Sequence, residues 1–204
     1  MRSKVVRTFC GKHLDYGSND GHVTKSLFGN KDIDDLYVSD IEFKISEANR
    51  SIAKNFLYID PVSSRIENEG SFFDSITCIH VIEHVSSVDC LMREMNRQLK
   101  VGGRLYLESP NSRSLFVPSL SSDRTWNFYD DPTHLRPYTT NALRSICLSH
   151  GFRILKSGIY RELKYAAIFP IAPIISLILR DWRPVHYASI HLIGWSSFVL
   201  CEKV

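Results

Sequence analysis

The chain alternates short apolar runs with stretches of helical periodicity, and this alternation limits its fold more than any other feature. Such alternation is typical of β–α–β units, in which helices join parallel strands. The unbroken apolar run at 73–79 is typical of a central strand that is covered on both faces. We therefore expect an α/β protein with a mostly parallel sheet. The predicted strands lie at about residues 13–16, 36–38, 56–59, 73–79, 104–108, 152–158 and 195–201.

Four helices are predicted between these strands. In the clearest one, Ser86 and Asp89 match a capping box, and Gly102 and Gly103 are expected to end the helix. Its apolar residues recur at helical spacing and form one face: Val88, Leu91, Met92, Met95 and Leu99. The other helices are expected at about 22–28, at 44–55, and from a cap at Thr139 or Thr140 to a stop at Gly151.

Length and composition predict one domain, 1–204, and exclude several classes of protein. The net charge is only +3 and Lys and Arg are scattered, so we expect no nucleic-acid partner. The five cysteines include no C-x-x-C pair, which argues against a disulfide framework or a cysteine zinc site and favours a reducing, cytoplasmic location. No apolar segment follows the basic N-terminus, so a secretory signal is not expected. The longest apolar stretch, 165–179, is too short and too interrupted by proline to span a membrane.

A glycine-rich turn follows the first predicted strand. Gly17 and Gly21 allow a positive φ and a close backbone approach to a ligand, and the next helix start offers free N–H groups. A plain strand–helix turn is the alternative. The dinucleotide fingerprint G-x-G-x-x-G is not matched, because His22 stands where its last glycine is needed, and an NAD enzyme is therefore disfavoured.

Two aspartates at predicted strand ends extend this hypothesis. Asp40 lies 19 residues after Gly21, where an acid in nucleotide-binding sheets accepts hydrogen bonds from ribose hydroxyls. A helix cap or a loop carboxylate is the alternative for Asp40. Asp60 ends the third strand and is placed to accept from the exocyclic amine of a base, although its position before Pro61 also suits a plain turn.

Three segments together resemble the motifs of class I S-adenosylmethionine-dependent methyltransferases. Residues 14–21 are similar to the first motif of that family, 73–85 to its fourth-strand motif, and 99–105 to the turn before its fifth strand. The resemblance covers about residues 12–111 and extends to about 160. It implies a Rossmann-like three-layer sandwich, with a mostly parallel seven-stranded sheet and an antiparallel last strand. Substrate-side insertions would then lie at about 112–137 and 161–190.

The resemblance also implies S-adenosylmethionine as the cofactor. Gly17 and Gly21 would admit its methionine part, Asp40 would hold the ribose, and Asp60 would meet the adenine amine. Ile79 and His80 would lie near the sulfonium. The full predicted cofactor set is Asp15, Gly17, Ser18, Asn19, Gly21, Asp40, Ile41, Asp60, Ile79 and His80.

The chain departs from the family at two points. Asn19 stands where many members have glycine, which suits the tolerance of asparagine for a positive φ. Only about a dozen residues precede the first predicted strand, so whether the pocket closes without a partner protein stays open.

The segment 126–138 is dense in aromatic and ionisable residues and follows the fifth strand, where open α/β sheets bind ligands. We predict that Asp131 orients His134, and that His134 removes a proton from a substrate hydroxyl. Arg136 is expected to pair with a phosphate or carboxylate, and Tyr129 and Tyr138 to contact the substrate. The alternative is a loop made rigid by prolines, with His134 packed inside it. A structural role is expected for Glu83 and His84, and no metal site, because no spacing here builds a full ligand set.

The apolar insert at 161–190 leaves three interpretations open: a buried lid, a dimer face, or a surface at 165–180 that contacts a membrane or a lipid-linked substrate. Burial within the fold is the expected one. The predicted activity is methyl transfer to a small-molecule hydroxyl, on a sugar, glycolipid or polysaccharide precursor. Two alternatives remain: another acceptor (a quinone-like phenol, or a nitrogen or carbon atom), or an inactive, cofactor-binding subunit of another protein.

Overall fold

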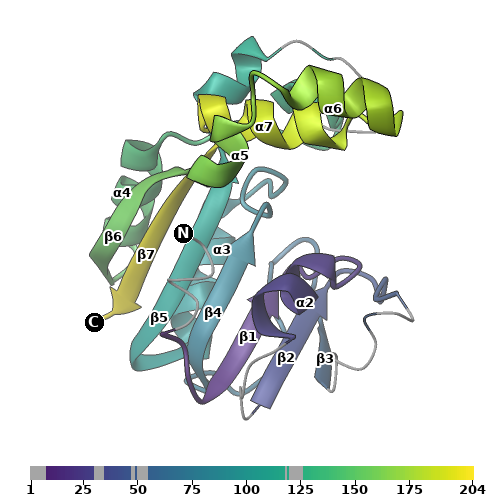
Figure 1. Cartoon of the computed structure of the whole chain (residues 1–204). Coiled ribbons are helices and arrows are strands. Elements are labelled where there is room, and N and C mark those ends of the chain that lie inside the picture. Colours follow the sequence, from purple (N-terminus) through teal and green to yellow (C-terminus); the bar gives the residue numbers. More distant parts are fainter. Residues whose placement is uncertain (1–7, 30–34, 47–48, 50–54, 118, 120–125) are drawn as a thin grey trace.

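The computed structural model describes residues 8–29, 35–46, 49, 55–117, 119 and 126–204. Its centre is a seven-stranded sheet in the order β3-β2-β1-β4-β5-β7-β6 (Figure 1). The strands are β1 (Lys12–Tyr16), β2 (Asp35–Asp40), β3 (Asn55–Tyr58), β4 (Phe73–Ile79), β5 (Leu99–Pro110), β6 (Phe152–Tyr160) and β7 (Ser196–Lys203). The first five are parallel neighbours, whereas β7 runs antiparallel to both β5 and β6. The predicted sheet, with its antiparallel last strand, is confirmed.

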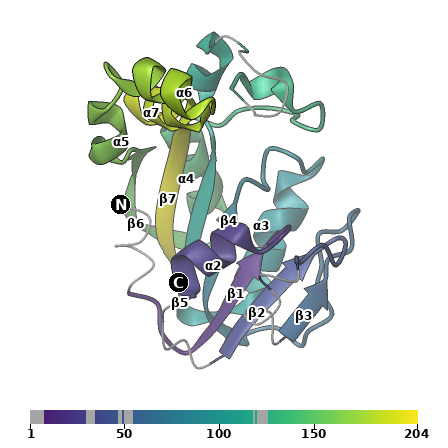
Figure 2. The same ribbon diagram turned by 45° about the vertical axis from the view of Figure 1, so that its right-hand side comes forward.

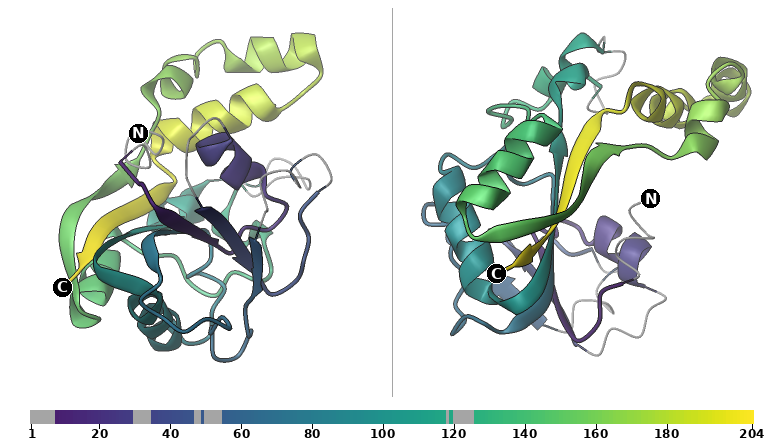
Figure 3. Two further views of the ribbon diagram at one scale, coloured as in Figure 1. Left: turned by 90° about the horizontal axis from the view of Figure 1, so that it is seen from below. Right: turned by 90° about the vertical axis from the view of Figure 1, so that its left-hand side faces the viewer.

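Helices cover both faces of the sheet (Figure 3). On one face, α3 (Val88–Gln98) and α4 (Thr140–Ser149) place Leu91, Met92 and Leu143 in the main core, together with strand residues such as Ile76. On the other face, α2 (His22–Phe28) contributes Phe28 to a second core. This is the three-layer arrangement that the sequence predicts, because each helix buries one apolar face against the sheet.

The ends of α3 differ from the prediction. Its cap is Ser87, whose side chain accepts a hydrogen bond from the Cys90 N–H at 3.3 Å, and not Ser86. The helix stops at Gln98, before the two glycines, because Leu99 is already extended and pairs with Phe73 of β4. Gly102 therefore lies within β5, at φ 77°. The predicted cap of α4 is confirmed at Thr139, which accepts from the Ala142 N–H.

Most of the helix expected at 44–55 lies outside the described residues, and 44–46 are not helical. Between β5 and α4 the chain forms two short 3-10 helices, η2 (Ser112–Phe116) and η3 (Phe128–Asp130). Asn127 caps η3 and also donates to the carbonyl oxygens of Leu115 and Val117, so it holds the two turns together. None of the helices in the described ranges is long and apolar enough to cross a membrane.

The insert between β6 and β7 folds into three helices, α5 (Leu163–Ala167), α6 (Ala172–Leu179) and α7 (Arg183–Ile193). They stand beyond the upper end of the sheet (Figure 2). Burial was the expected outcome for this apolar segment, and for α6 that expectation is wrong. Only Ala172 and Ser176 of α6 are buried, because α6 packs mainly against α7 and turns most of its surface outward. Its exposed apolar residues are Ile174, Leu177, Ile178 and Leu179.

Candidate active site

The carboxyl ends of β1, β2 and β4 meet at one edge of the sheet, and the chain leaves β1 and β4 in opposite directions along the sheet (Figure 1). In open α/β sheets, this reversal of strand order opens a crevice where ligands bind. The predicted cofactor residues follow these three strands and β3. The topology therefore gathers segments that are far apart in the sequence.

The turn after β1 is held by its backbone. The N–H groups of Gly17 and Ser18 both donate to the Ser39 carbonyl oxygen, at 2.8 and 2.9 Å. Gly17 and Gly21 have φ of 77° and 78°, and Asn19 has φ of 47°, so three residues of the turn are left-handed. A Cβ on Gly17 would overlap Cγ2 of Val81, in the turn after β4. Glycine is therefore required at 17 both by its φ and by the close approach of Val81.

Asp40 ends β2 beside this turn, as predicted. Its Oδ2 accepts from the Asn19 N–H and its Oδ1 from the Ile41 N–H, both at 2.7 Å. A carboxylate has about four lone-pair sites, so ribose hydroxyls can still donate to it. Ile41 lies next to Asp40 and is half exposed, which provides an apolar surface for a base.

Asp15 and Asp60 have local hydrogen-bonding roles in this structure. Asp15 is buried and accepts from the hydroxyls of Thr24 and Thr77, so it ties β1 to α2 and β4. Asp60 Oδ1 accepts from the Ser63 N–H and hydroxyl and from the Val62 N–H. These bonds, those of Ser63 first, hold the pKa of Asp60 below its usual value. The turn that the sequence offered as the alternative for Asp60 is thus present.

Two buried hydroxyls test whether the site fits a polar cofactor. Ser18 Oγ and Ser39 Oγ have no hydrogen-bond partner among the described residues, although both atoms are buried. They belong to the two residues that join β1 to β2 at the turn. Because a buried polar group without a partner is costly, this polar cradle suits a hydroxyl- or amine-bearing ligand.

The two predicted residues at the end of β4 have different environments. Ile79 is buried in the second core. His80 has φ of 56°, and its ring reaches two buried carboxylates: Nδ1 is 3.2 Å from Glu83 Oε1, and Nε2 is 3.7 Å from Glu108 Oε1. A left-handed non-glycine residue is strained, and such residues concentrate at functional sites.

A cavity of about 890 Å³ extends from the turn and α2 to α5 and α7. Six of the eight histidines line it, namely His22, His80, His84, His134, His186 and His191. Asn19, Asp131 and Trp195 line it as well. Tyr165 stacks on His191 with ring centroids 5.2 Å apart, and Tyr187 lies beside them, so the wall formed by α5 and α7 is aromatic.

The predicted pair of Asp131 and His134 lies at this cavity. His134 Nδ1 is 2.6 Å from the Phe128 carbonyl oxygen, so Nδ1 carries the proton and Nε2 keeps its lone pair. Nε2 lies 3.8 Å from Asp131 Oδ2, which is too long for a hydrogen bond. Burial alone would raise the pKa of Asp131, but hydrogen bonds from the Thr133 hydroxyl and N–H lower it. Asp131 is therefore charged near His134.

The other predicted substrate residues lie elsewhere. Neither Arg136, Tyr138 nor Tyr129 lines the cavity. Tyr138 is part of the main core. Burial raises the pKa of its hydroxyl, and the hydrogen bond that Arg136 Nε donates to this hydroxyl offsets only part of that rise. Tyr129 is exposed to solvent. Loop residues close to His134 in the sequence cannot be assigned to its cavity from spacing alone.

The sequence did not predict that Tyr160, Glu162 and the insert form one wall of the cavity. A signal existed, because His186, Tyr187 and His191 of α7 recur at helical spacing and share one face with Ile190.

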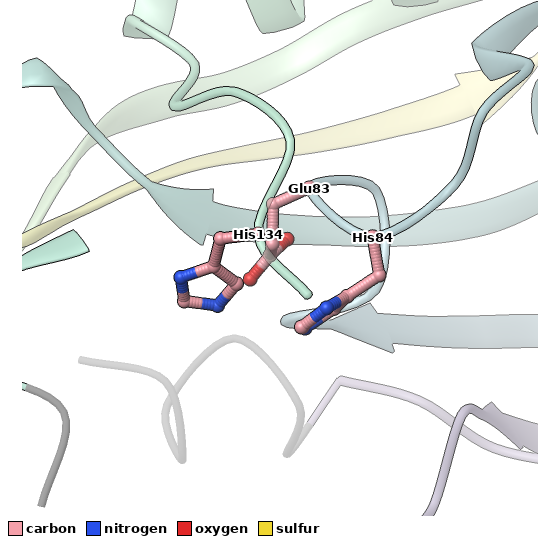
Figure 4. Close-up of side chains that lie close together, drawn as sticks. All are labelled: Glu83, His84 and His134. Atoms are coloured by element: carbon pink, nitrogen blue, oxygen red, sulfur yellow. The ribbon is translucent and has the colours of Figure 1, made fainter. Parts of the chain in front are cut away.

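Glu83 and His84 lie together with His134 (Figure 4). One ligand atom from each lies within 4.8 Å of those of the other two. Glu83 is fully buried, and its Oε2 has no hydrogen-bond partner in the described part of the chain. The Glu83 carbonyl oxygen accepts from the Leu135 N–H at 2.8 Å, which docks the loop of His134 against the turn of His84.

Comparison with known proteins agrees with this architecture. The family model described as a methyltransferase domain matches residues 7–157. No curated protein sequence matches the chain. A S-adenosylmethionine-dependent methyltransferase from Archaeoglobus fulgidus is 21% identical with a TM-score of 0.60, and the match covers 100% of this chain and 95% of that one.

Two other solved structures share the fold. A chain from the complex between the Haloferax volcanii Trm112 methyltransferase activator and a methyltransferase has a TM-score of 0.67 at 14% identity, covering 94% of this chain and 81% of that one. A phosphoethanolamine N-methyltransferase of Haemonchus contortus, in complex with S-adenosyl-L-methionine, has a TM-score of 0.65 at 14% identity. That match covers 99% of this chain and 52% of the other.

The contact between Gly17 and Val81 generates a prediction with a matched control. Gly17→Ala and Gly102→Ala both place alanine at φ 77°, but a Cβ at Gly102 has nothing within 4 Å. Each substitution is expected to lower the free energy of unfolding by about 1–2 kcal/mol through backbone strain. Gly17→Ala should cost about 1–3 kcal/mol more, because of the overlap with Val81. Urea unfolding of both variants measures the difference.

The double variant Gly17→Ala/Val81→Ala tests the cause. Removing the Val81 methyl groups should recover about 1 kcal/mol or more of the extra loss, seen as a favourable coupling energy. Equal losses for the two glycine variants would contradict the overlap.

Proposed function

This chain belongs to the methyltransferase-domain family, and we propose that it transfers a methyl group from S-adenosylmethionine to a hydroxyl of a small molecule: a sugar, glycolipid or polysaccharide precursor. One observation carries the proposal. One cavity extends from Asn19 of the glycine turn after β1 to a wall of histidine and tyrosine side chains. The proposed binding sites for the cofactor and for the acceptor are therefore next to each other.

The residues at the strand ends suit this cofactor. The left-handed turn at Gly17 and Gly21 would admit its methionine part, Asp40 would accept from its ribose, and the exposed Ile41 would pack against its adenine. The unpartnered hydroxyl of Ser18 offers a further polar contact. When bound, S-adenosylmethionine supplies a methyl group that its sulfonium already makes electrophilic. The chain's task is to align the acceptor with that methyl group and to exclude water.

His134 is suited to act as the base. Its Nδ1–H is held by the Phe128 carbonyl, so the Nε2 lone pair is available to accept the proton of an acceptor hydroxyl. The charge of Asp131, 3.8 Å away, stabilises the imidazolium that results. The aromatic wall of Tyr165, Tyr187 and His191 suits a ring-shaped acceptor. A quinone-like phenol, or a nitrogen or carbon acceptor, is the alternative substrate class, which a screen of methylated products distinguishes.

A second function is a cofactor-binding subunit that is inactive without a partner. The observation that favours it is the similarity to a chain from a complex with a methyltransferase activator. Turnover by the purified chain alone would exclude it.

The exposed face of α6 supports an acceptor that is attached to a lipid. Ile174, Leu177, Ile178 and Leu179 are more than half exposed, and the exposed Arg180 and Trp182 follow directly. Apolar side chains followed by Arg180 and Trp182, with Asp181 between these two, suit the surface of an anionic membrane. α6 and α7 form a helical hairpin, and α7, its second helix, lines the cavity. A cytoplasmic enzyme at the membrane surface would thus receive the head group while the lipid stays in the bilayer, and its five free cysteines suit that reducing compartment.

Cofactor binding is tested by calorimetry with S-adenosylmethionine and S-adenosylhomocysteine. Asp40→Ala should weaken binding by about tenfold or more, about 1.4 kcal/mol, because the ribose loses its acceptor. Glu42→Ala is the control, since this nearby exposed carboxylate pairs with Lys44. Equal affinity for wild type and Asp40→Ala would remove Asp40 from the site. No binding by the folded wild-type chain would favour the subunit that needs a partner.

The role of His134 is tested by turnover. His134→Ala should lower kcat by about 10²–10⁴-fold and leave cofactor affinity nearly unchanged, because the imidazole acts on the acceptor. His150→Ala is the matched control, as His150 binds Asp89 away from the cavity. Unchanged turnover in His134→Ala would end the assignment.

The lipid surface is tested by flotation with mixed phosphatidylcholine and phosphatidylglycerol vesicles. Leu177→Glu/Ile178→Glu should abolish vesicle binding, because it puts charge on the apolar face. Val62→Glu/Val101→Glu alters two equally exposed valines elsewhere and should leave binding intact. If wild type does not float but forms a dimer that the α6 variant disperses, the face contacts a second copy of the chain instead.

A further inference from the structure

We propose that Glu83, His84 and His134 bind a divalent first-row transition-metal ion at the wall of the acceptor cavity. The ligand atoms of the three side chains lie within 4.8 Å of one another. Glu83 and His84 come from the turn after β4, and His134 comes from the loop after η3 (Figure 4). No spacing in the sequence reveals this set, because about fifty residues separate its two halves.

The hydrogen bonds around both histidines leave the correct nitrogen available. The Thr133 hydroxyl donates to Asp131 Oδ1 at 2.6 Å, so it accepts from the His84 Nδ1–H, 2.8 Å away. His134 Nδ1 donates to the Phe128 carbonyl in the same way. Each ring therefore keeps a lone pair on Nε2. Histidine ligands of metal ions are typically held like this, with the other nitrogen donating to a carbonyl or a polar group.

Glu83 provides the third ligand. Its Oε1 contacts His80 Nδ1 at 3.2 Å, whereas its Oε2 is buried and has no hydrogen-bond partner in the described ranges. A buried carboxyl oxygen without a partner is costly, and a cation or a donor at this place would remove the cost. In Figure 4 the carboxylate lies between the two imidazole rings. A cation at this point would satisfy the oxygen and both lone pairs together.

The donor set selects the kind of ion. Two neutral imidazoles with one carboxylate suit Zn²⁺, Co²⁺, Mn²⁺ or Fe²⁺, whereas Mg²⁺ and Ca²⁺ prefer oxygen ligands. Three protein ligands leave coordination positions open, as in catalytic rather than structural sites. His84 and His134 both line the cavity, so an open position would face the acceptor.

The role of the ion, unlike its binding, rests on the proposed function. A metal-bound hydroxyl has a lower pKa, so the ion would ease removal of the acceptor's proton. With the ion bound, His134 Nε2 would be a ligand, so the role of base proposed above for His134 applies to the chain without the ion. The proton would then pass from the acceptor oxygen to the Asp131 carboxylate, whose Oδ2 is 3.8 Å from His134 Nε2.

Metal binding is measured on the full chain, first stripped with a chelator, by Zn²⁺ calorimetry and by the visible absorption of bound Co²⁺. The wild type should bind one ion per chain and prefer Zn²⁺ and Co²⁺ over Mg²⁺. His84→Ala and Glu83→Gln should lose this binding, while His150→Ala keeps it. Circular dichroism shows which variants are folded. If Glu83→Gln does not fold, because Glu83 is buried, the loss of metal binding is judged from His84→Ala alone.

The hydrogen bond to His84 gives a finer test. Thr133→Val removes the acceptor of the His84 N–H and should weaken Zn²⁺ binding by about 10–100-fold, and Thr133→Ser should restore it. Equal Zn²⁺ affinity in His84→Ala and wild type would overturn the proposal. So would a wild-type chain that binds S-adenosylmethionine but no metal, and the proposed function would then stand. Metal binding without cofactor binding would support the site and count against the proposed function.

Discussion

Two backbone amides converge on one carbonyl oxygen, and the functional end of the molecule depends on that contact. The N–H groups of Gly17 and Ser18 both reach Ser39 O, so the chain must turn sharply as it leaves β1. That turn brings Gly17 against Val81 and sets the Asn19 N–H on Asp40. The ends of β1, β2 and β4 are thereby fixed relative to one another, and the Val81 side chain occupies the space beside Gly17. Position 17 therefore has room for nothing larger than a hydrogen atom, which requires glycine there.

A second constraint positions the loop that carries His134. The loop after η3 is attached to the turn after β4 by the bond from the Leu135 N–H to Glu83 O, and Phe128 packs on the His134 ring. The His134 side chain is only 5% exposed, so its orientation is set by packing as well as by hydrogen bonding. Reactive groups held in this way need little reorganisation when a ligand arrives, which favours catalysis.

The sequence predicts the half of the site that is local. The glycine turn and Asp40 follow directly from apolar strands that end in small and acidic residues, and the structure has them where the pattern indicates. The far wall could not be predicted, because its residues come from α5, α7 and the loop at 131–134 and meet only in three dimensions. Tyr138 was misjudged for a related reason, since an aromatic residue in a polar segment gives no sign of whether it faces a cavity or the core. The exposure of α6 was missed because an apolar sequence does not indicate what covers it.

The helical hairpin between β6 and β7 lies outside the part of the chain that is typical of the family. Residues 161–193 supply the aromatic wall, yet they lie after the stretch that the family model matches, which ends at residue 157. The hairpin leaves the sheet at the end of β6 and returns at the start of β7, two strands that pair along their length. Its two attachment points are therefore adjacent, and its sequence can change without altering the register of the sheet. In the function proposed above, the insert would contact the acceptor while the sheet holds the cofactor, so a change in the insert could alter the choice of acceptor without altering the cofactor site.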